Sequence, residues 1–320
     1  MSDNITFVTA LYFSQPTSRM GGRGWCLDFW KAPFKNILSM NIPLVIYTDD
    51  YNDQATRLES FLKEENYTKY KIIKRKLEDF SLSEKIFNLK EQANIIDDKG
   101  LKEGVSTIAN QRNYHLCLQK IFWLNEQASI NPFSSTKFYW IDFGLFHHTI
   151  FPDSLGGMEK LIKIDKSKYW PENKDNMFSP VLAEKLFNYS EDKFFCIIHE
   201  NEPIQYQAYS LFPDSKPHSG YIIGGLFGGT IDIIGFIFEK FNHVMQVVYE
   251  NNMLLLEEPI LSIVYSNNVD KCKTLSFVNW YHDCPGGAID RCNYGITSDV
   301  RSFYKVFYND LLGLYKTPNP

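Results

Sequence analysis

Apolar runs alternate with amphipathic stretches along the first third of the chain. The apolar runs ITFVTALYF (5–13) and IPLVIYTDD (42–50) and the alternating run KYKIIKRKL (69–77) have the patterns of strands. Residues 27–40 and 54–65, which lie between them, have the spacing of helices. Strands that alternate with helices are typical of a parallel sheet covered on its faces by helices. The unbroken apolar run before Asp49 favours a strand that is buried on both sides.

The later chain continues this pattern, with one irregular section. Residues 151–217 have a weak pattern and indicate short helices and loops. The other predicted elements are a helix over 106–127, the strand KFYWIDFGLF (137–146), the strand YIIGG (221–225), a loop GGLFGG that turns the chain, helices over 230–250 and 257–267, and the strand LSFVNWY (275–281). We therefore predict an α/β fold with a mixed, mainly parallel sheet flanked by helices, in one unit over 1–320.

The stretch GYIIGGLFGGTIDIIGFIFEK (220–240) raises the question of a membrane span. A span needs about 20 mostly apolar residues, and the glycines and Asp232 in this stretch argue against one. The start of the chain, MSDNITFVTALYF, lacks the basic region and apolar core of a signal peptide. We predict a cytoplasmic protein without a transmembrane span, and peripheral association with the inner face of the membrane stays open.

Charge and cysteine content exclude two further classes of protein. The 33 basic and 38 acidic residues give a net charge of -5, which argues against a nucleic-acid partner because such binding relies on a basic surface. The basic run KYKIIKRK indicates either a solvated strand face or a phosphate-binding surface. Six cysteines without a CxxC pair argue against a zinc ribbon or a redox dithiol.

Candidate site residues follow strands or share a helix face. Asp142 follows a large apolar run, where a parallel strand delivers side chains to a ligand crevice, and it is a candidate metal or sugar ligand. Gly144 would let a phosphate or metal approach the backbone. The alternative is that Asp142 caps a turn. Asn113 and Lys120 lie seven residues apart on the predicted long helix, so both could face the same cleft.

Two more candidates belong to the first two predicted strands. Thr9 lies near the end of the first strand and Asp49 at the end of the second. The carboxyl ends of parallel strands meet at one edge of a sheet. We therefore predict that both side chains face a ligand at this edge, where they would hold the base and ribose if that ligand is a nucleotide.

The motifs TFVTALYF, PLVIYTDD, FYWIDFGLF, YIIGGLFGG, EEPILS and NWYH occur in this order and together resemble the bacterial HtrL/YibB family. That family is similar to nucleotide-sugar glycosyltransferases of the GT-A type, and the resemblance covers most of the chain. It implies a nucleotide-binding half (1–150) and an acceptor-side half (151–320). It also implies transfer of a sugar from a nucleoside-diphosphate donor, UDP-sugar favoured, to a hydroxyl of a glycan or glycolipid.

The resemblance implies a divalent cation, Mn²⁺ or Mg²⁺, on the donor diphosphate. The family's DxD-like turn corresponds to Asp142, but Gly144 stands where a second acid would be. One carboxylate, diphosphate oxygens and a distant imidazole can still hold such an ion. His282 is the predicted distant ligand, and a structural, hydrogen-bonded histidine is the alternative.

Further roles follow from the same resemblance. Glu258, and Glu257 after it, would be the base toward the acceptor hydroxyl, and Lys120 would stabilise the departing diphosphate. Both acids also fit the first turn of a helix for electrostatic reasons alone.

The glycines of YIIGGLFGG are also assigned by the resemblance. Gly224, Gly225 and Gly228 would lie beneath the donor sugar. Tight packing of a helix against a strand is the structural alternative.

Two other classes of protein stay open. SRMGGRGW (18–25) suggests a sugar-phosphate nucleotidyltransferase, although SQPTS separates this loop from the first strand. Gly144 in place of an acid suggests a catalytically inactive GT-A-like protein that serves as a binding or scaffold subunit.

Overall fold

The computed structural model describes residues 4–12, 27–80, 82, 108–143, 180–199, 210–213, 221–251, 253 and 255–277. These residues form a seven-stranded sheet in the order β3-β2-β1-β4-β6-β5-β7. Its strands are β1 (Ile5–Leu11), β2 (Leu44–Thr48), β3 (Tyr70–Lys74), β4 (Lys137–Ile141), β5 (Phe194–His199), β6 (Tyr221–Thr230) and β7 (Cys272–Phe277). The α-helices are α1 (Leu27–Ser39), α2 (Gln54–Glu64), α4 (Ile108–Ile130), α7 (Pro180–Ser190), α8 (Ile231–Glu250) and α9 (Glu257–Asn267).

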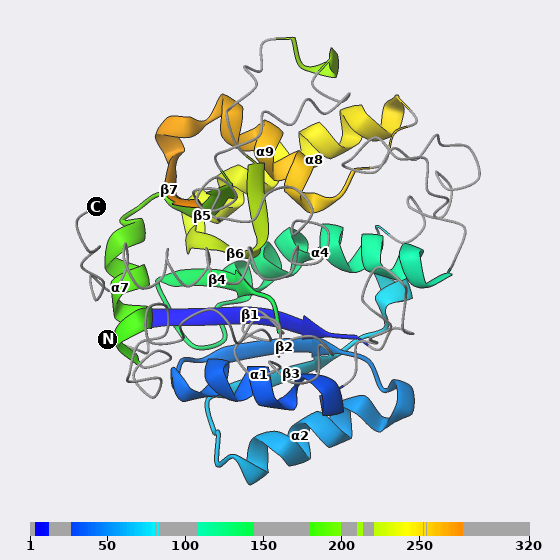
Figure 1. Ribbon diagram of the computed structural model, residues 1–320, viewed down its shortest axis with the longest axis vertical. Coiled ribbons are helices and arrows are strands. Elements are labelled where there is room, and N and C mark those ends of the chain that lie inside the picture. Colours follow the sequence, from blue (N-terminus) through cyan, green and yellow to red (C-terminus); the bar gives the residue numbers. More distant parts are fainter. Residues whose placement is uncertain are drawn as a thin grey trace, which may run out of the picture.

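The sheet is mixed but mostly parallel, as the sequence predicts. Strand β1 pairs in parallel with β2 and β4, β2 pairs in parallel with β3, and β5 pairs in parallel with β7. Strand β6 runs antiparallel to both of its neighbours, β4 and β5. Figure 1 shows α1 and α2 beside β2 and β3 at one end of the sheet, with α8 and α9 near the other end.

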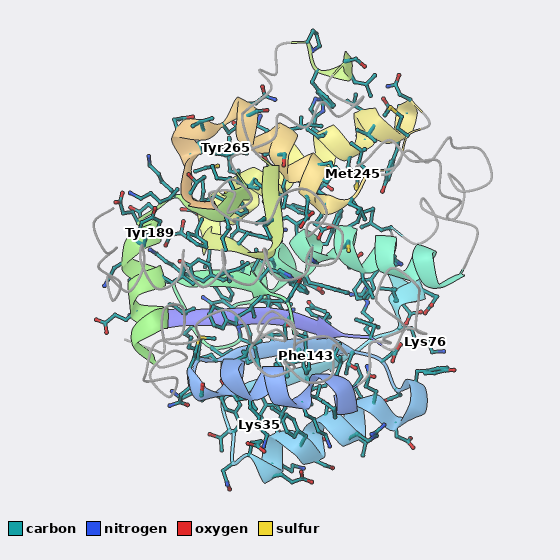
Figure 2. All side chains as sticks on the ribbon, viewed as in Figure 1. Lys35, Lys76, Phe143, Tyr189, Met245 and Tyr265 are labelled. Atoms are coloured by element: carbon teal, nitrogen blue, oxygen red, sulfur yellow. The ribbon has the colours of Figure 1, made fainter. Side chains whose placement is uncertain are left out.

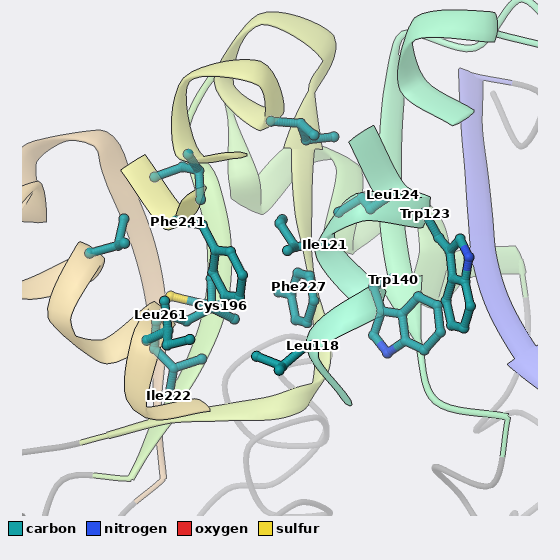
Figure 3. Packing of buried hydrophobic residues seen from close by; sticks show 14 of the residues in the cluster. Leu118, Ile121, Trp123, Leu124, Trp140, Cys196, Ile222, Phe227, Phe241 and Leu261 are labelled. Carbon is teal, nitrogen blue, oxygen red and sulfur yellow. The ribbon is translucent and has the colours of Figure 1, made fainter. Parts of the chain in front are cut away.

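Side chains alternate between the two faces of the sheet and build two apolar layers. Phe7 of β1 and Ile141 of β4 pack on the layer that holds α1, α2 and α7. Val8 and Trp140 point the other way, into the layer with α4, α8 and α9. Figure 3 shows part of this second layer, where Trp123 of α4 lies beside Trp140 of β4.

The first layer ends just past β4. Phe143, labelled in Figure 2, lies near α1. It stacks on Phe34 of that helix, with ring centroids 3.7 Å apart. Because Phe143 is buried on one side of the sheet, the chain leaves β4 with Asp142 near the opposite layer.

Strand β6 corrects one prediction. The segment GGLFGG continues the strand instead of turning the chain, because its backbone bonds to β4 on one side and β5 on the other. The pairing with β5 passes from Phe227 directly to Ile223, so Gly224, Gly225 and Leu226 form a bulge on that side. The predicted irregularity therefore exists, but inside a strand.

The section predicted as short helices and loops is also corrected. It contains α7 and, in FFCIIH (194–199), strand β5, which lies inside the sheet between β6 and β7. Helix α4 ends three residues later than predicted, at Ile130. The edge strand β3 has the half-exposed pattern that its alternation indicates. Among the described helices, none is long and apolar enough to cross a bilayer.

Candidate functional site

A pocket lies at the carboxyl ends of β1 and β4. After β1 the chain moves to β2 and β3 on one side, whereas after β4 it continues to β5, β6 and β7 on the other side. Such a reversal in an open α/β sheet is where ligands bind. The pocket holds about 290 Å³ and is lined by Ala10, Tyr12, Leu116, Cys117, Lys120, Trp123, Trp140, Asp142, Phe143, Leu256, Glu257 and Glu258.

Lys120 of α4 joins three elements at the base of this pocket. Its Nζ lies 3.0 Å from Oδ1 of Asp142, which follows β4, and 2.8 Å from Oε1 of Glu257, at the start of α9. It also donates a hydrogen bond to the carbonyl of Gly224 in β6, at 3.1 Å. An ammonium group has three N–H donors, so these contacts use all of them.

The cluster keeps Lys120 charged. Burial alone would lower the pKa of Lys120, but the carboxylates of Asp142 and Glu257 outweigh burial and hold this pKa well above its ordinary value. The side chain of Glu257 is only 4% exposed, whereas that of Asp142 is 28% exposed. Lys120 thus fixes one buried and one accessible carboxylate next to each other.

The bulge of β6 supplies the other backbone contacts of the site. The Gly224 N–H donates to Oε1 of Glu258 at 2.7 Å. A Cβ at Gly224 would lie 2.5 Å from Oε1 of Glu257, so only a residue without a side chain leaves room for this carboxylate. The Asp142 N–H donates to the Gly225 carbonyl at 2.9 Å and anchors the residue after β4.

Aromatic rings form the wall of the pocket. The Trp140 indole N–H donates to Oδ1 of Asp142 at 2.7 Å, and its ring lies 5.8 Å from Nζ of Lys120. Trp123 stacks on Trp140 and on Tyr12, with centroids 5.8 and 5.5 Å apart. These rings exclude water from one side of the charged cluster, which strengthens its electrostatic interactions.

Cys117 lines the same pocket but is a poor nucleophile. Burial, reinforced by the charge of Glu257, raises the pKa of its thiol well above the ordinary value. A thiol with a raised pKa remains protonated and unreactive at neutral pH. Among the described lining residues, the carboxylates are the better candidates for acid–base chemistry.

Several sequence-predicted residues come together here. Asp142, Lys120, Glu257 and Glu258 line the pocket, and Gly224 binds two of them through its backbone. Ion pairs and hydrogen bonds between these residues hold the assembly together.

Other predicted residues lie elsewhere. Thr9 is buried inside β1, and Asp49 accepts the Tyr51 N–H at 3.2 Å in the turn after β2. Neither belongs to the pocket lining. A Cβ at Gly228 would lie 2.1 Å from the Phe138 carbonyl, which favours the packing explanation for this glycine.

Three more predicted positions fall outside what the structure describes. Asn113 lies on α4, but its side chain is not among the described ones. Gly144 and His282 lie outside the described residues altogether. Their predicted roles stay predictions.

The aromatic wall was not predicted from the sequence, although the spacing of its tryptophans from the predicted site residues indicates it. Trp140 precedes Asp142 by two residues, and strand periodicity puts both on one side. Trp123 follows Lys120 by three residues, a spacing that brings two side chains together on a helix. A polar residue accompanied by an aromatic residue at these spacings therefore marks the pocket from two elements.

The predicted cation stays a prediction for the described part of the chain. There, no group of three or more histidine, cysteine or acidic side chains is arranged to hold a metal ion. Asp142 is available as one ligand, although Lys120 already neutralises it. Any cation at Asp142 would need further ligands from the donor or from residues such as His282.

Comparison with known proteins adds no family. No protein-family model matches the chain, and no curated protein matches it in sequence. The fold and the pocket are the observations from which a function can be inferred.

Proposed function

We propose that the chain is a nucleotide-sugar-dependent glycosyltransferase with a GT-A-like fold. It would move a sugar from a nucleoside-diphosphate donor, UDP-sugar favoured, to a hydroxyl of a glycan or glycolipid. One observation carries this proposal: the Lys120–Asp142–Glu257 cluster lines a pocket at the reversal point between β1 and β4. The order of motifs that resembles the HtrL/YibB family supports the same class.

The chemistry of the pocket suits a sugar. Carboxylates accept hydrogen bonds from hydroxyl groups, and the half-buried Leu116 and Leu256 offer apolar surface beside them. A volume of about 290 Å³ is near the lower limit for small-molecule pockets and suits one sugar unit better than a whole nucleotide sugar. We place the donor sugar here and the nucleotide beyond it, toward β1 and β2.

Glu258 is the better candidate for the base. The ammonium of Lys120 already occupies Oε1 of Glu257, and the Glu257 side chain is only 4% exposed, so an acceptor hydroxyl has little access to it. Glu258 instead binds the Gly224 N–H through Oε1. In a single displacement, Glu258 would take the proton of the acceptor hydroxyl while that oxygen bonds to the anomeric carbon and the bond to the diphosphate breaks.

Lys120 would act mainly by positioning. Its three donors already serve Asp142, Glu257 and the Gly224 carbonyl, so a direct bond to the leaving diphosphate requires the loss of one of them. We propose that Lys120 holds the carboxylates of Asp142 and Glu257 in fixed positions. Its positive charge would stabilise the departing diphosphate without direct contact.

The charge balance of the pocket supports the predicted cation. Three carboxylates face one ammonium, so a diphosphate that approaches Asp142 meets an excess of negative charge. We propose that Asp142 holds Mn²⁺ or Mg²⁺ together with the donor and His282. The ion would neutralise the diphosphate.

A donor screen tests the proposal. The full chain is incubated with UDP-sugars and other nucleotide sugars plus Mn²⁺, and release of the nucleoside diphosphate is measured with and without oligosaccharide acceptors. We expect hydrolysis or transfer with one donor and its loss in Glu258→Gln. Binding of nucleotide without turnover would indicate the inactive scaffold, and absence of both would reject the proposal.

A further inference from the structure

A second pocket lies on another face of α4. It holds about 600 Å³, and α4 contributes Gln119, Phe122 and Glu126 to it. The segment after β3 forms one wall with Arg75 and Phe80, and α8 contributes Phe238. Phe80 also packs on Trp123 of the first pocket, with centroids 5.4 Å apart, so one aromatic layer separates the two pockets.

A buried chain of hydrogen bonds orients the carboxylate of Glu126. The hydroxyl of Tyr47 donates to its Oε2 at 2.6 Å, and Gln127 donates to that hydroxyl at 2.5 Å. Arg75 lies 3.5 Å from Oε1 of the same carboxylate. Tyr47 and Gln127 are fully buried, whereas 40% of the Glu126 side chain is exposed. Interior polar groups therefore fix an accessible acceptor at the pocket.

The pocket also contains a polar side chain that is short of a donor. Gln119 is 96% buried, because its exposed fraction is 4%, and it lines the pocket. In the described part of the chain its Oε1 has no hydrogen-bond partner. This oxygen is itself buried, and an unsatisfied buried acceptor is costly. A rotation of the Gln119 side chain toward the pocket would therefore be favoured by a ligand that brings a hydroxyl donor.

Phenylalanine rings supply the apolar part of the lining. Phe122 and Phe238 meet edge to face, with centroids 5.0 Å apart. The Arg75 guanidinium lies 4.1 Å above the Phe80 ring and is held there by its contact with Glu126. Arg75, the cation among the described lining residues of this pocket, is therefore already in contact with Glu126 and Phe80.

These features select one class of ligand. Glu78, Asp79 and Glu126 outnumber Arg75 among the charged lining residues, which disfavours phosphates and other anions. An accessible carboxylate beside aromatic rings suits a molecule with many hydroxyls and an apolar face. We propose that this pocket binds a neutral saccharide, with Glu126 and Gln119 accepting its hydroxyls and Phe122 and Phe238 covering its apolar face. The proposal does not depend on transfer in the first pocket.

Saturation-transfer difference NMR on the full chain tests this site. The probes are the methyl glycosides of glucose, galactose and N-acetylglucosamine at millimolar concentration. We expect saturation transfer to at least one of them, and an affinity about tenfold weaker in Glu126→Gln, the effect of losing one hydrogen bond to a charged group. Phe122→Leu should weaken the same glycoside, and Glu239→Gln, an exposed acid on α8, should not. Urea unfolding checks that each variant is folded.

Two results would overturn the saccharide site. One is the absence of saturation transfer to all three glycosides in the wild type. The other is a signal that survives Glu126→Gln and Phe122→Leu but disappears in Asp142→Asn, because the sugar then binds in the first pocket. That second result leaves the proposed transferase intact. Conversely, loss of binding in Glu126→Gln without turnover of any donor supports the saccharide site while the transferase fails.

Discussion

Lys120 of α4 and Glu257 of α9 form an ion pair of 2.8 Å in which both side chains are nearly inaccessible to water. Asp142 completes the cluster from the end of β4. A charge that is buried without its partner is costly. The two helices and the strand are therefore tied together by the same residues that would contact a substrate.

Replacing Lys120 by Met should destabilise the chain. Two carboxylates would lose their cation, and we expect a loss of about 3 kcal/mol, the lower end of the range for breaking a buried pair, because Asp142 is partly exposed. The measurement is urea unfolding. Adding Glu257→Gln to Lys120→Met should recover part of the loss.

The matched control for Lys120 is the exposed pair of Lys63 with Glu59, at 2.9 Å on α2. Lys63→Met should leave the unfolding curve unchanged, since exposed pairs contribute little. If Lys120→Met proves as stable as Lys63→Met, the buried cluster does not hold α4 and α9 together.

Three glycines should respond differently to alanine. Gly224→Ala pushes the Glu257 carboxylate away, so we expect turnover of the donor to fall more than stability. Gly228→Ala presses on the backbone of β4 and should cost about 1–3 kcal/mol or more. Gly235→Ala on α8 meets no atom within 4 Å and should stabilise the helix by about 0.5–1 kcal/mol. Equal losses of turnover and stability in Gly224→Ala would assign that glycine to packing alone.

The sequence predicts most of the sheet because local patterns suffice for it. Apolar runs mark β1, β2 and β4, and helical spacing gives α9 its observed bounds, Glu257–Asn267. Strand β5 was missed because FFCIIH lies in a section with many polar residues and prolines, and its pairing with β7 comes from much later in the chain.

The sequence marks individual residues of the site, but it does not predict which of them contact each other. Asp142, Lys120 and Glu258 stand out as polar groups at strand ends, on a helix stripe and in a helix first turn. Lys120 and Glu258 both contact the bulge in β6, which exposes the carbonyl and the N–H of Gly224. Local periodicity does not encode how strands far apart in sequence align, so the bulge could not be predicted.

Alkaline pH should reveal buried tyrosines. Burial raises the pKa of the Tyr249 phenol, and among the described residues its hydroxyl has no hydrogen-bond partner. Below about pH 10 the phenol is neutral in the folded and unfolded chain; above it the unfolded chain ionises first. The free energy of unfolding should therefore fall as pH rises through this range, and Lys120, whose pKa is also raised, adds to the fall.

Tyr249→Phe should flatten that fall and raise stability at neutral pH by up to about 1 kcal/mol, because an unsatisfied buried hydroxyl is removed. Tyr67→Phe is the matched control: it also removes a phenol whose pKa burial raises, but this hydroxyl donates to the Ile42 carbonyl. Tyr67→Phe should lose about 1 kcal/mol at neutral pH. Urea unfolding from pH 7 to strongly alkaline pH separates the two, and identical behaviour of the variants would contradict the difference in bonding.

Glu258→Gln should mainly reduce transfer, whereas Glu257→Gln should mainly reduce stability. Glu258→Gln should leave nucleotide affinity unchanged and reduce transfer by about 10²–10⁴-fold, as for loss of a general base. Glu257→Gln should instead lower the free energy of unfolding, because Lys120 loses its closest partner. Calorimetric titration with UDP measures nucleotide affinity, and turnover of the donor identified by the screen measures transfer. Urea unfolding measures the stability of Glu257→Gln. Transfer that survives in Glu258→Gln would leave this acid as a partner of the helix dipole only.

Divalent metal should stabilise the chain only together with nucleotide. Asp142 alone competes poorly for an ion while Lys120 holds it, so Mn²⁺ without UDP should shift the melting temperature little. With UDP or a UDP-sugar, diphosphate oxygens add ligands, and Mn²⁺ should raise the melting temperature by mass action on the folded state. A chelator should reverse the increment.

Asp142→Asn and His282→Ala should each abolish that metal-dependent increment, and the double variant should be no worse than either single one, because members of one site are not additive. Asp232→Asn, an exposed acid in the first turn of α8, is the control and should keep the full increment. Additive, partial losses would mean that Asp142 and His282 act separately. If UDP binds equally well in chelator and both variants behave like the wild type, the metal-dependent mechanism is wrong, and a metal-independent transferase that uses Lys120 or an inactive scaffold becomes the better interpretation.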